Sequence, residues 1–276
     1  MSYKTILVHI NNGRRCEVRL ELGARLARTM DAHLVGLYAE TQFQMPPHAA
    51  ALAGVNFQAG IDEARRESIA AAERTFQAHM KRNDDLKTEW RSSTLDAVSA
   101  VSLHARYADL AVIGQANAED GSNLDTDFPE RLLFASGRPL LIVPYAGRFP
   151  TLGEKVLVCW SATRESTRAV TDALPLLKRA KQVHVATFNP GRGAHGQIPG
   201  ADIGLFLTRH GVKVEVSEYR AKDLDVGSQI LSRAADLASD LIVMGGYGHS
   251  RVQELFLGGV SRTMLEAMTV PVLMSH

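Results

Sequence analysis

The chain has 276 residues, of which 45% are hydrophobic and 22% charged, and its formal net charge is +1. These values are typical of globular proteins and exclude a disordered, collagen-like or disulfide-rich chain. The near-zero charge provides no basic field for nucleic acid or an anionic membrane. The short N-terminal apolar run precedes basic residues, which is the wrong order for a signal peptide. We therefore expect a cytoplasmic protein with no nucleic-acid or membrane partner.

The first half alternates short β-branched runs, typical of buried strands, with segments of helical period. Segment 41–60 between two of these elements is rich in Ala, Pro, Gly and Gln and has no clean period, so it is either a mobile loop or lid, or a cap on the sheet. The predicted elements are strands around 6–8, 32–38, 86–92, 109–114 and 139–144, and helices over 14–30, 58–82 and 95–106.

The same pattern recurs in the second half. The run at 6–8 reappears at 156–158, and the later strands reappear at 182–188, 240–245 and 271–275. The remaining predicted elements are a strand near 212–218 and helices at 164–180, 200–210 and 226–238. Alternating strands and helices predict a parallel sheet covered by helices on both faces. The fold class is therefore α/β in two tandem domains, 1–148 and 149–276, joined by the Gly- and Pro-containing linker around 146–153.

A glycine-rich segment at 240–262 carries the candidate chemistry. A buried strand ends at Met244, a turn Gly245-Gly246-Tyr247-Gly248 follows, and Gly258-Gly259-Val260-Ser261 opens the final helix. Glycine lets the backbone approach a ligand closely, and a helix N-terminus offers N–H groups to an anion such as phosphate. The serine hydroxyl either meets a phosphate oxygen or caps the helix. On spacing alone, ordinary turn chemistry is the commoner explanation of such glycines.

The order Gly245-x-x-Gly248, nine residues, then Gly258, after the strand DLIVMG, resembles the nucleotide-binding signature of the universal stress protein family. The whole chain resembles a tandem of two such domains. The resemblance implies five-stranded, Rossmann-like sheets of the adenine nucleotide α-hydrolase type. It also implies that ATP, with or without magnesium, binds with its adenine and ribose near the first two strands and its phosphates on the glycine turns. Finally, it implies an internal pseudo-dimer through the edges at 139–144 and 271–275, while a homodimer of the chain stays open.

Carried over by position, the resemblance nominates a set of nucleotide contacts in the second domain. Gly259 stands where the family has Ser or Thr, Ser161 stands where it often has a ribose-binding Asp, and Phe188 either stacks on adenine or fills core. The nominated contacts are Trp160, Ser161, Phe188, Met244, Gly245, Gly248, Gly258, Gly259, Val260 and Ser261. His249 and Arg251 follow the turn and either reach phosphate oxygens or lie exposed on the surface. Tyr247, within the turn, either packs over the ribose or covers the loop.

The first domain departs further from the signature. It lacks the second glycine after Gly114, and Asp120, Asp125 and Asp127 stand where phosphates would lie. Carboxylates repel a triphosphate, so we predict that this domain does not bind ATP and that its acidic loop is solvated. Asn11 takes the place of the family's first-strand Asp.

The sequence carries no P-loop, dinucleotide fingerprint, nucleophile elbow or zinc-protease motif. Cys16 and Cys159 have no metal-ligand or disulfide spacing, so no metal site is expected. No catalytic residue is nominated, and enzyme activity is limited to weak ATP hydrolysis at most. Two hypotheses remain. The first is a stress-response signalling module that binds ATP or a related adenine nucleotide in its second domain, with the first domain serving dimerisation or regulation. The second is a nucleotide-independent scaffold or chaperone-like protein.

Overall fold

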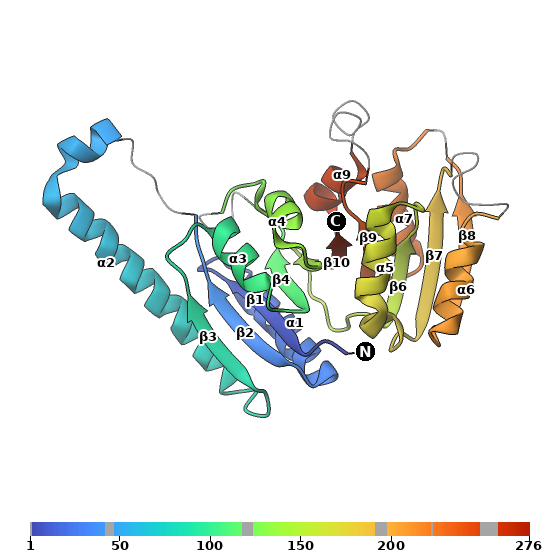
Figure 1. Cartoon of the computed structure of the whole chain (residues 1–276), viewed down its shortest axis with the longest axis horizontal. Coiled ribbons are helices and arrows are strands. Elements are labelled where there is room, and N and C mark those ends of the chain that lie inside the picture. The colour runs from blue at the N-terminus through green and yellow to red at the C-terminus, as the bar shows by residue number, and fades with distance from the viewer. Residues whose placement is uncertain (1, 42–46, 118–123, 191–197, 222, 249–258) are drawn as a thin grey trace.

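Within the described residues, a ten-stranded sheet runs through the molecule (Figure 1). The computed structural model describes residues 2–41, 47–117, 124–190, 198–221, 223–248 and 259–276, with residues 47–58 described by their backbone alone. The strand order is β3-β2-β1-β4-β5-β10-β9-β6-β7-β8. Neighbouring strands within each half are parallel, and β5 and β10, at the centre, pair antiparallel.

Each half follows the predicted alternation of strands and helices. The N-terminal half contains β1 (Thr5–Ile10), α1 (Cys16–Met30), β2 (His33–Tyr38), α2 (Pro47–Met80), β3 (Thr88–Ser92), α3 (Ala97–Ala105), β4 (Leu110–Gly114), α4 (Phe128–Ser136) and β5 (Leu140–Val143). The C-terminal half contains β6 (Lys155–Cys159), α5 (Arg164–Leu177), β7 (Gln182–Phe188), α6 (Ala201–Arg209), β8 (Val214–Tyr219), α7 (Val226–Asp236), β9 (Leu241–Gly245), α9 (Val260–Ala267) and β10 (Val272–Ser275).

Two hydrophobic cores cover the two faces of the sheet. Side chains alternate along each strand, so on β1 Ile6 and Val8 enter one core and Leu7 enters the other. Helices α1, α2, α5 and α6 pack on the first face, and α3, α4, α7 and α9 pack on the second. The central strands are buried on both sides, which explains why their sequences are continuously apolar.

The two halves are joined as the predicted internal pseudo-dimer. Leu141 of β5 lies opposite Leu273 of β10, and both are fully buried. Away from the sheet, the Tyr3 hydroxyl donates a hydrogen bond of 2.6 Å to the carbonyl oxygen of Asp172 in α5. The halves therefore share backbone pairing and buried side chains, which an association through a flexible linker would not provide.

Two segments differ from the sequence prediction. Segment 41–60 was expected as a loop, a lid or a cap, but its residues from Pro47 onward form the start of α2, which projects beyond the sheet (Figure 1). Within residues 59–80, whose side chains are described, the buried apolar side chains lie toward the end of the helix and include Phe76. The segment after β4 was expected as an acidic loop, but it contains α4. Asp125 and Asp127, before that helix, are exposed and pair with Arg131.

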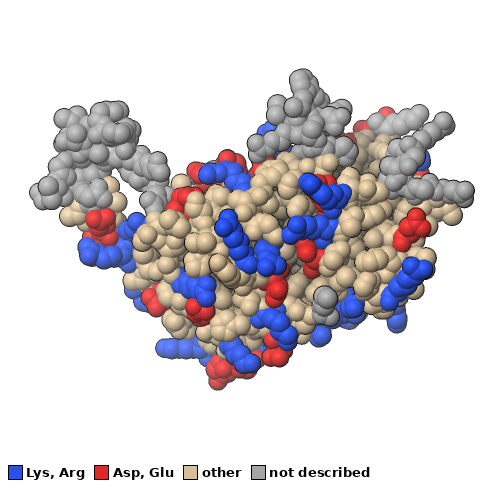
Figure 2. Space-filling model, in the orientation of Figure 1, with Lys and Arg blue, Asp and Glu red and all other residues tan. Residues whose placement is uncertain are grey.

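Acidic and basic side chains are interspersed on the described surface in Figure 2, in keeping with the small net charge. None of the helices in the described ranges has the length and apolar character needed to cross a membrane.

Candidate functional site

The candidate site lies where β6, β7 and β9 end. Parallel strands bring their carboxyl ends to one edge of the sheet, which is where open α/β sheets bind ligands. Cys159 lies opposite both Met244 of β9 and Ala186 of β7. The N–H group of Trp160 donates to the Ala186 carbonyl at 2.8 Å. The nominated segments 160–161, 188 and 244–248 therefore share this edge.

The glycine turn is tied directly to the start of α9. Tyr247 has a φ of 54°, in the left-handed region, and its N–H group donates to Ser261 Oγ at 2.9 Å. Gly259 is the N-cap of α9. Because glycine has no side chain, it offers no acceptor to the N–H groups of the first turn of this helix. These amides carry the partial positive charge of the helix N-terminus. The turn and the helix start are thus fixed relative to each other by a side chain that the sequence nominated.

The N-terminus of α5 packs against both glycines of the turn. A Cβ added at Gly245 would lie 2.5 Å from the backbone nitrogen of Ser166, and one added at Gly248 would lie 2.9 Å from Glu165 Oε2. The helix starts here because Thr163 and Ser166 form a capping box. Gly245 is therefore required by close backbone packing within the protein, and Gly248 lies against the side chains of Glu165 and Thr163, whatever either glycine contributes to a ligand.

Glu165 places a buried carboxylate beside the glycine turn. The residue is 5% exposed, and its Oε1 accepts a hydrogen bond of 3.0 Å from Nε of Arg164. Burial acts to raise the pKa of Glu165, but hydrogen bonds from its own backbone, Arg164 and Thr163 outweigh burial and hold the pKa below its usual value. Glu165 was not nominated from sequence. A Thr-x-x-Ser cap marks the helix start, but no local pattern indicates that this side chain reaches Gly248.

The structure separates the nominated aromatic residues. Trp160 packs against the core on the α5 side of the sheet, whereas Phe188 packs against the core on the α7 side. The ring of Phe188 stacks on that of Tyr219, with centroids 5.5 Å apart. The guanidinium of Arg233 lies over the Tyr219 ring, 4.2 Å from its centroid. Ser161 is exposed, and its Oγ lies 3.2 Å from Thr163 Oγ1. Ser161 thus lies near the start of α5 and the turn, whereas Phe188 lies with the outer strands.

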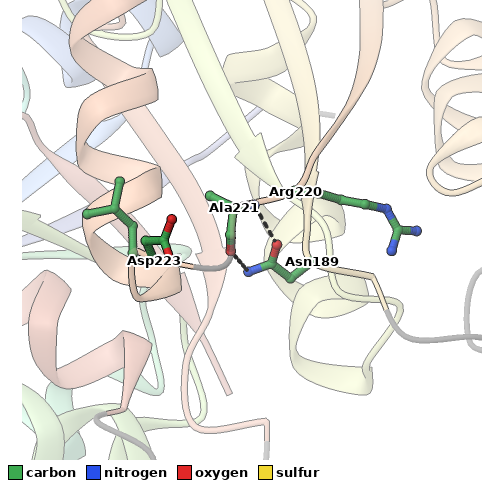
Figure 3. A pocket seen from close by; sticks show the side chains of 5 residues that line it. Asn189, Arg220, Ala221 and Asp223 are labelled. Atoms are coloured by element: carbon green, nitrogen blue, oxygen red, sulfur yellow. Dashed lines mark hydrogen bonds between the residues drawn. The ribbon is translucent and has the colours of Figure 1, made fainter.

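A hollow of about 860 Å³ opens beside Asn189, where β7 and β8 end (Figure 3). It is lined by Asn189, Arg220, Ala221, Asp223 and Leu224. The Asn189 side chain accepts from the Ala221 N–H at 3.0 Å and donates to its carbonyl at 3.1 Å, which extends the pairing of the two strands. The hollow therefore lies on the same sheet edge as the glycine turn, and its lining combines polar and apolar side chains.

The corresponding edge of the N-terminal half is built differently. Arg19 is 2% exposed, and its Nη1 lies 2.7 Å from the position that a Cβ on Gly114 would take. Its guanidinium donates to the carbonyl of His9 at 3.2 Å and to Oδ1 of Asn11. Burial and the nearby guanidinium lower the pKa of His9 to about 3, so the ring is neutral at physiological pH. Beside Gly114, the buried Arg19 side chain thus occupies the place that the backbone of α5 takes beside Gly245.

Some nominated residues lie outside the described residues, namely Asp120, His249, Arg251 and Gly258. Burial raises the pKa of the Cys159 thiol, so it is protonated and unsuited to nucleophilic attack. Among the residues that the structure covers, no group of three or more His, Cys, Asp or Glu side chains is arranged to hold a metal.

Comparison with known proteins agrees with this architecture. The model of the universal stress protein family matches residues 153–276, and comparison with curated protein sequences gives no match. A universal stress protein of Archaeoglobus fulgidus DSM 4304 has a TM-score of 0.72 and 16% identity, over 98% of this chain and 95% of that one. A functionally unknown protein of Pseudomonas aeruginosa PAO1 has a TM-score of 0.61 and 16% identity, over 99% of this chain and 92% of that one.

One smaller relative, a universal stress protein solved in complex with cAMP, covers 51% of this chain and 97% of its own, with a TM-score of 0.37 and 18% identity. At 16% identity the two full-length neighbours establish the fold alone, and they establish it for both halves. Residues 153–276 therefore form a universal stress protein domain, and the N-terminal half is a second domain of the same fold.

Proposed function

We propose that the C-terminal domain binds ATP or a related adenine nucleotide and that the protein acts as a nucleotide-dependent signalling module. The observation that carries this proposal is the hydrogen bond between the Tyr247 N–H group and Ser261 Oγ. It joins the glycine turn to a helix start whose N-cap is a glycine, so the uncapped amides of α9 lie next to the turn. Such amides favour a phosphate group.

The surroundings fit the remainder of a nucleotide. The hollow beside Asn189 lies on the same sheet edge, and its walls combine amide, guanidinium and carboxylate groups. Ribose hydroxyls and a base offer both donors and acceptors to such groups. The exposed Ser161 hydroxyl, beside the α5 start, supplies one further group between the two regions.

The test is isothermal titration of ATP, with and without magnesium, into the full chain. Val260 is the first residue of α9, a position where proline suits the helix but removes one N–H donor. Losing a hydrogen bond to a charged group costs about 1.5–3 kcal/mol, so Val260→Pro should weaken ATP binding about tenfold or more. A wild-type chain that binds no adenine nucleotide would refute the proposal.

Val226→Pro is the matched control. Val226 is likewise the first residue of its helix, α7, and it packs against the same core as Val260. The two substitutions should therefore have similar effects on stability, while Val226→Pro leaves ATP binding unchanged. Equal effects of both substitutions on binding would assign the phosphate contacts to another part of the chain.

One observation favours the alternative, a nucleotide-independent scaffold. The buried carboxylate of Glu165 lies against Gly248, where it repels an anion placed on the turn. Under this alternative the carboxylate is the permanent occupant of the turn and the glycines serve packing alone. Glu165→Gln would then leave the chain without nucleotide affinity. Under the main proposal the same substitution strengthens ATP binding.

A further inference from the structure

We infer that the N-terminal domain completes the nucleotide site of the C-terminal domain, with Phe134 of α4 and Gln115 after β4 as positioning residues. This inference rests on the proposed function and adds how the site is held. It gives the N-terminal half a role that does not require it to bind a ligand.

The first contact is between α4 and the glycine turn. The ring of Phe134 lies 5.0 Å from that of Tyr247 and 4.6 Å from that of His276. Nδ1 of His276 lies within hydrogen-bond distance, 3.1 Å, of the Gly246 carbonyl oxygen. The neighbouring α4 residue, Leu133, is 2% exposed and would overlap a Cβ added at Gly246. The turn is therefore enclosed on one side by the other domain.

This contact acts on a strained part of the turn. Tyr247 holds a positive φ, which is uncommon for a residue with a bulky side chain and persists where the surroundings determine it. Its N–H group is the one that donates to Ser261 Oγ. Packing of the ring against Phe134 therefore favours the backbone geometry that joins the turn to the start of α9.

The second contact fixes the other end of α9. Nε2 of Gln115 donates to the carbonyl oxygens of Leu265 at 2.8 Å and Glu266 at 3.0 Å, in the last turn of this helix. Oε1 of Gln115 accepts from the Tyr145 N–H at 3.0 Å, which fixes the amide in place. Gln115 is 7% exposed, so these hydrogen bonds are shielded from water. A residue of the N-terminal half thus sets the position of the helix whose N-terminus faces the ligand.

The pseudo-symmetry of the fold explains the arrangement. Gln115 follows β4 as Gly246 follows β9, and the antiparallel pairing of β5 with β10 brings each position next to the last helix of the other half. At this position the N-terminal domain carries a side chain that reaches across the junction, whereas the C-terminal domain has a glycine. Both elements of the proposed phosphate site, the turn and α9, are consequently held by the domain that lacks the glycine signature.

The experiment measures the Kd of Mg-ATP and of adenosine for the full chain and its variants. Phe134→Ala and Gln115→Met should each weaken Mg-ATP about five- to tenfold, a typical strength for coupling through packed side chains. Both should leave adenosine within about twofold, because the positioned elements face the phosphates. Phe134→Tyr keeps the ring and should retain wild-type affinity. Phe134→Leu, with a smaller change in apolar volume, replaces the alanine variant if that variant does not fold.

Phe149→Ala is the matched control, because Phe149 lies in the linker and packs against the opposite core. It should lower the melting temperature without changing either Kd. Unchanged Mg-ATP affinity in both positioning variants, or equal losses for Mg-ATP and adenosine, would overturn the inference while leaving the proposed function intact. A wild-type chain that binds neither ligand would overturn both.

Discussion

Replacing Gly245 by alanine separates a packing role of this glycine from a ligand-binding role. The new Cβ would lie 2.5 Å from the backbone nitrogen of Ser166 and 2.6 Å from the backbone carbon of Glu165. An ordinary contact begins at 3.4 Å, so the start of α5 would have to withdraw by about 0.9 Å. Backbone atoms cannot rotate out of the way as a side-chain end can, so the strain is borne by the helix.

The expected cost follows from two terms. Overpacking a tight core costs about 1–3 kcal/mol, and loss of the Thr163–Ser166 cap costs about 1 kcal/mol more. Gly245→Ala should therefore lower the free energy of unfolding by about 2–4 kcal/mol, which corresponds to a fall in melting temperature of the order of 10 °C. Calorimetry without any nucleotide is the appropriate assay, because the cost is independent of a ligand.

Gly60→Ala provides the control. Gly60 lies on the exposed part of α2, where an added Cβ meets no described atom within 4 Å. Alanine favours a helix over glycine by about 1 kcal/mol, so this variant should be as stable as the wild type or more stable. A Gly245→Ala protein whose unfolding free energy stays within about 0.5 kcal/mol of the wild type would refute the packing argument.

Three further predictions concern buried polar groups. The pKa of His9 is lowered to about 3 in the folded protein. The stabilisation that depends on its neutral ring is therefore fully present above about pH 6.5 and is lost as the pH falls toward 3. In urea denaturation, His9 should lower the free energy of unfolding by about 2 kcal/mol at pH 5 relative to pH 7. A His9→Gln protein whose stability depends on pH in the same way as the wild type would contradict this prediction. Ser261→Ala leaves the Tyr247 N–H without its acceptor and should cost about 1–3 kcal/mol in the same assay, and an unchanged midpoint would argue against this hydrogen bond. Tyr3→Phe removes the hydrogen bond to Asp172 across the junction and should lower the free energy of unfolding by about 1 kcal/mol. An unchanged value in calorimetry would show that this contact is absent in solution.

The strands could be predicted from sequence because each is a short β-branched run bounded by polar residues. The repeat reinforced the assignment, since the run at Val156-Leu157-Val158 repeats that at Ile6-Leu7-Val8. The start of α2 was missed because residues 47–60 show no apolar period, and a helix that projects beyond the sheet does not need one. Helix α4 was missed because its apolar residues follow an acidic stretch that was interpreted as loop.

The candidate site was predictable where its residues are local in sequence. Gly245, Gly248 and Ser261 lie within one segment, and the structure joins them through the turn and α9. Glu165 lies more than 80 residues earlier, so no spacing rule connects it with Gly248. Phe134 and Gln115 lie in the other half of the chain, beyond any local pattern.

The sequence by itself determined the secondary structure period, the internal repeat and the glycine-rich segment, because these depend on the order of neighbouring side chains. Only the tertiary structure decided that β5 and β10 pair antiparallel, that the backbone of α5 fills the space beside Gly245, and that α4 encloses Tyr247. These contacts join residues far apart in the chain, and they form only because burial of two apolar faces fixes where every helix lies on the sheet.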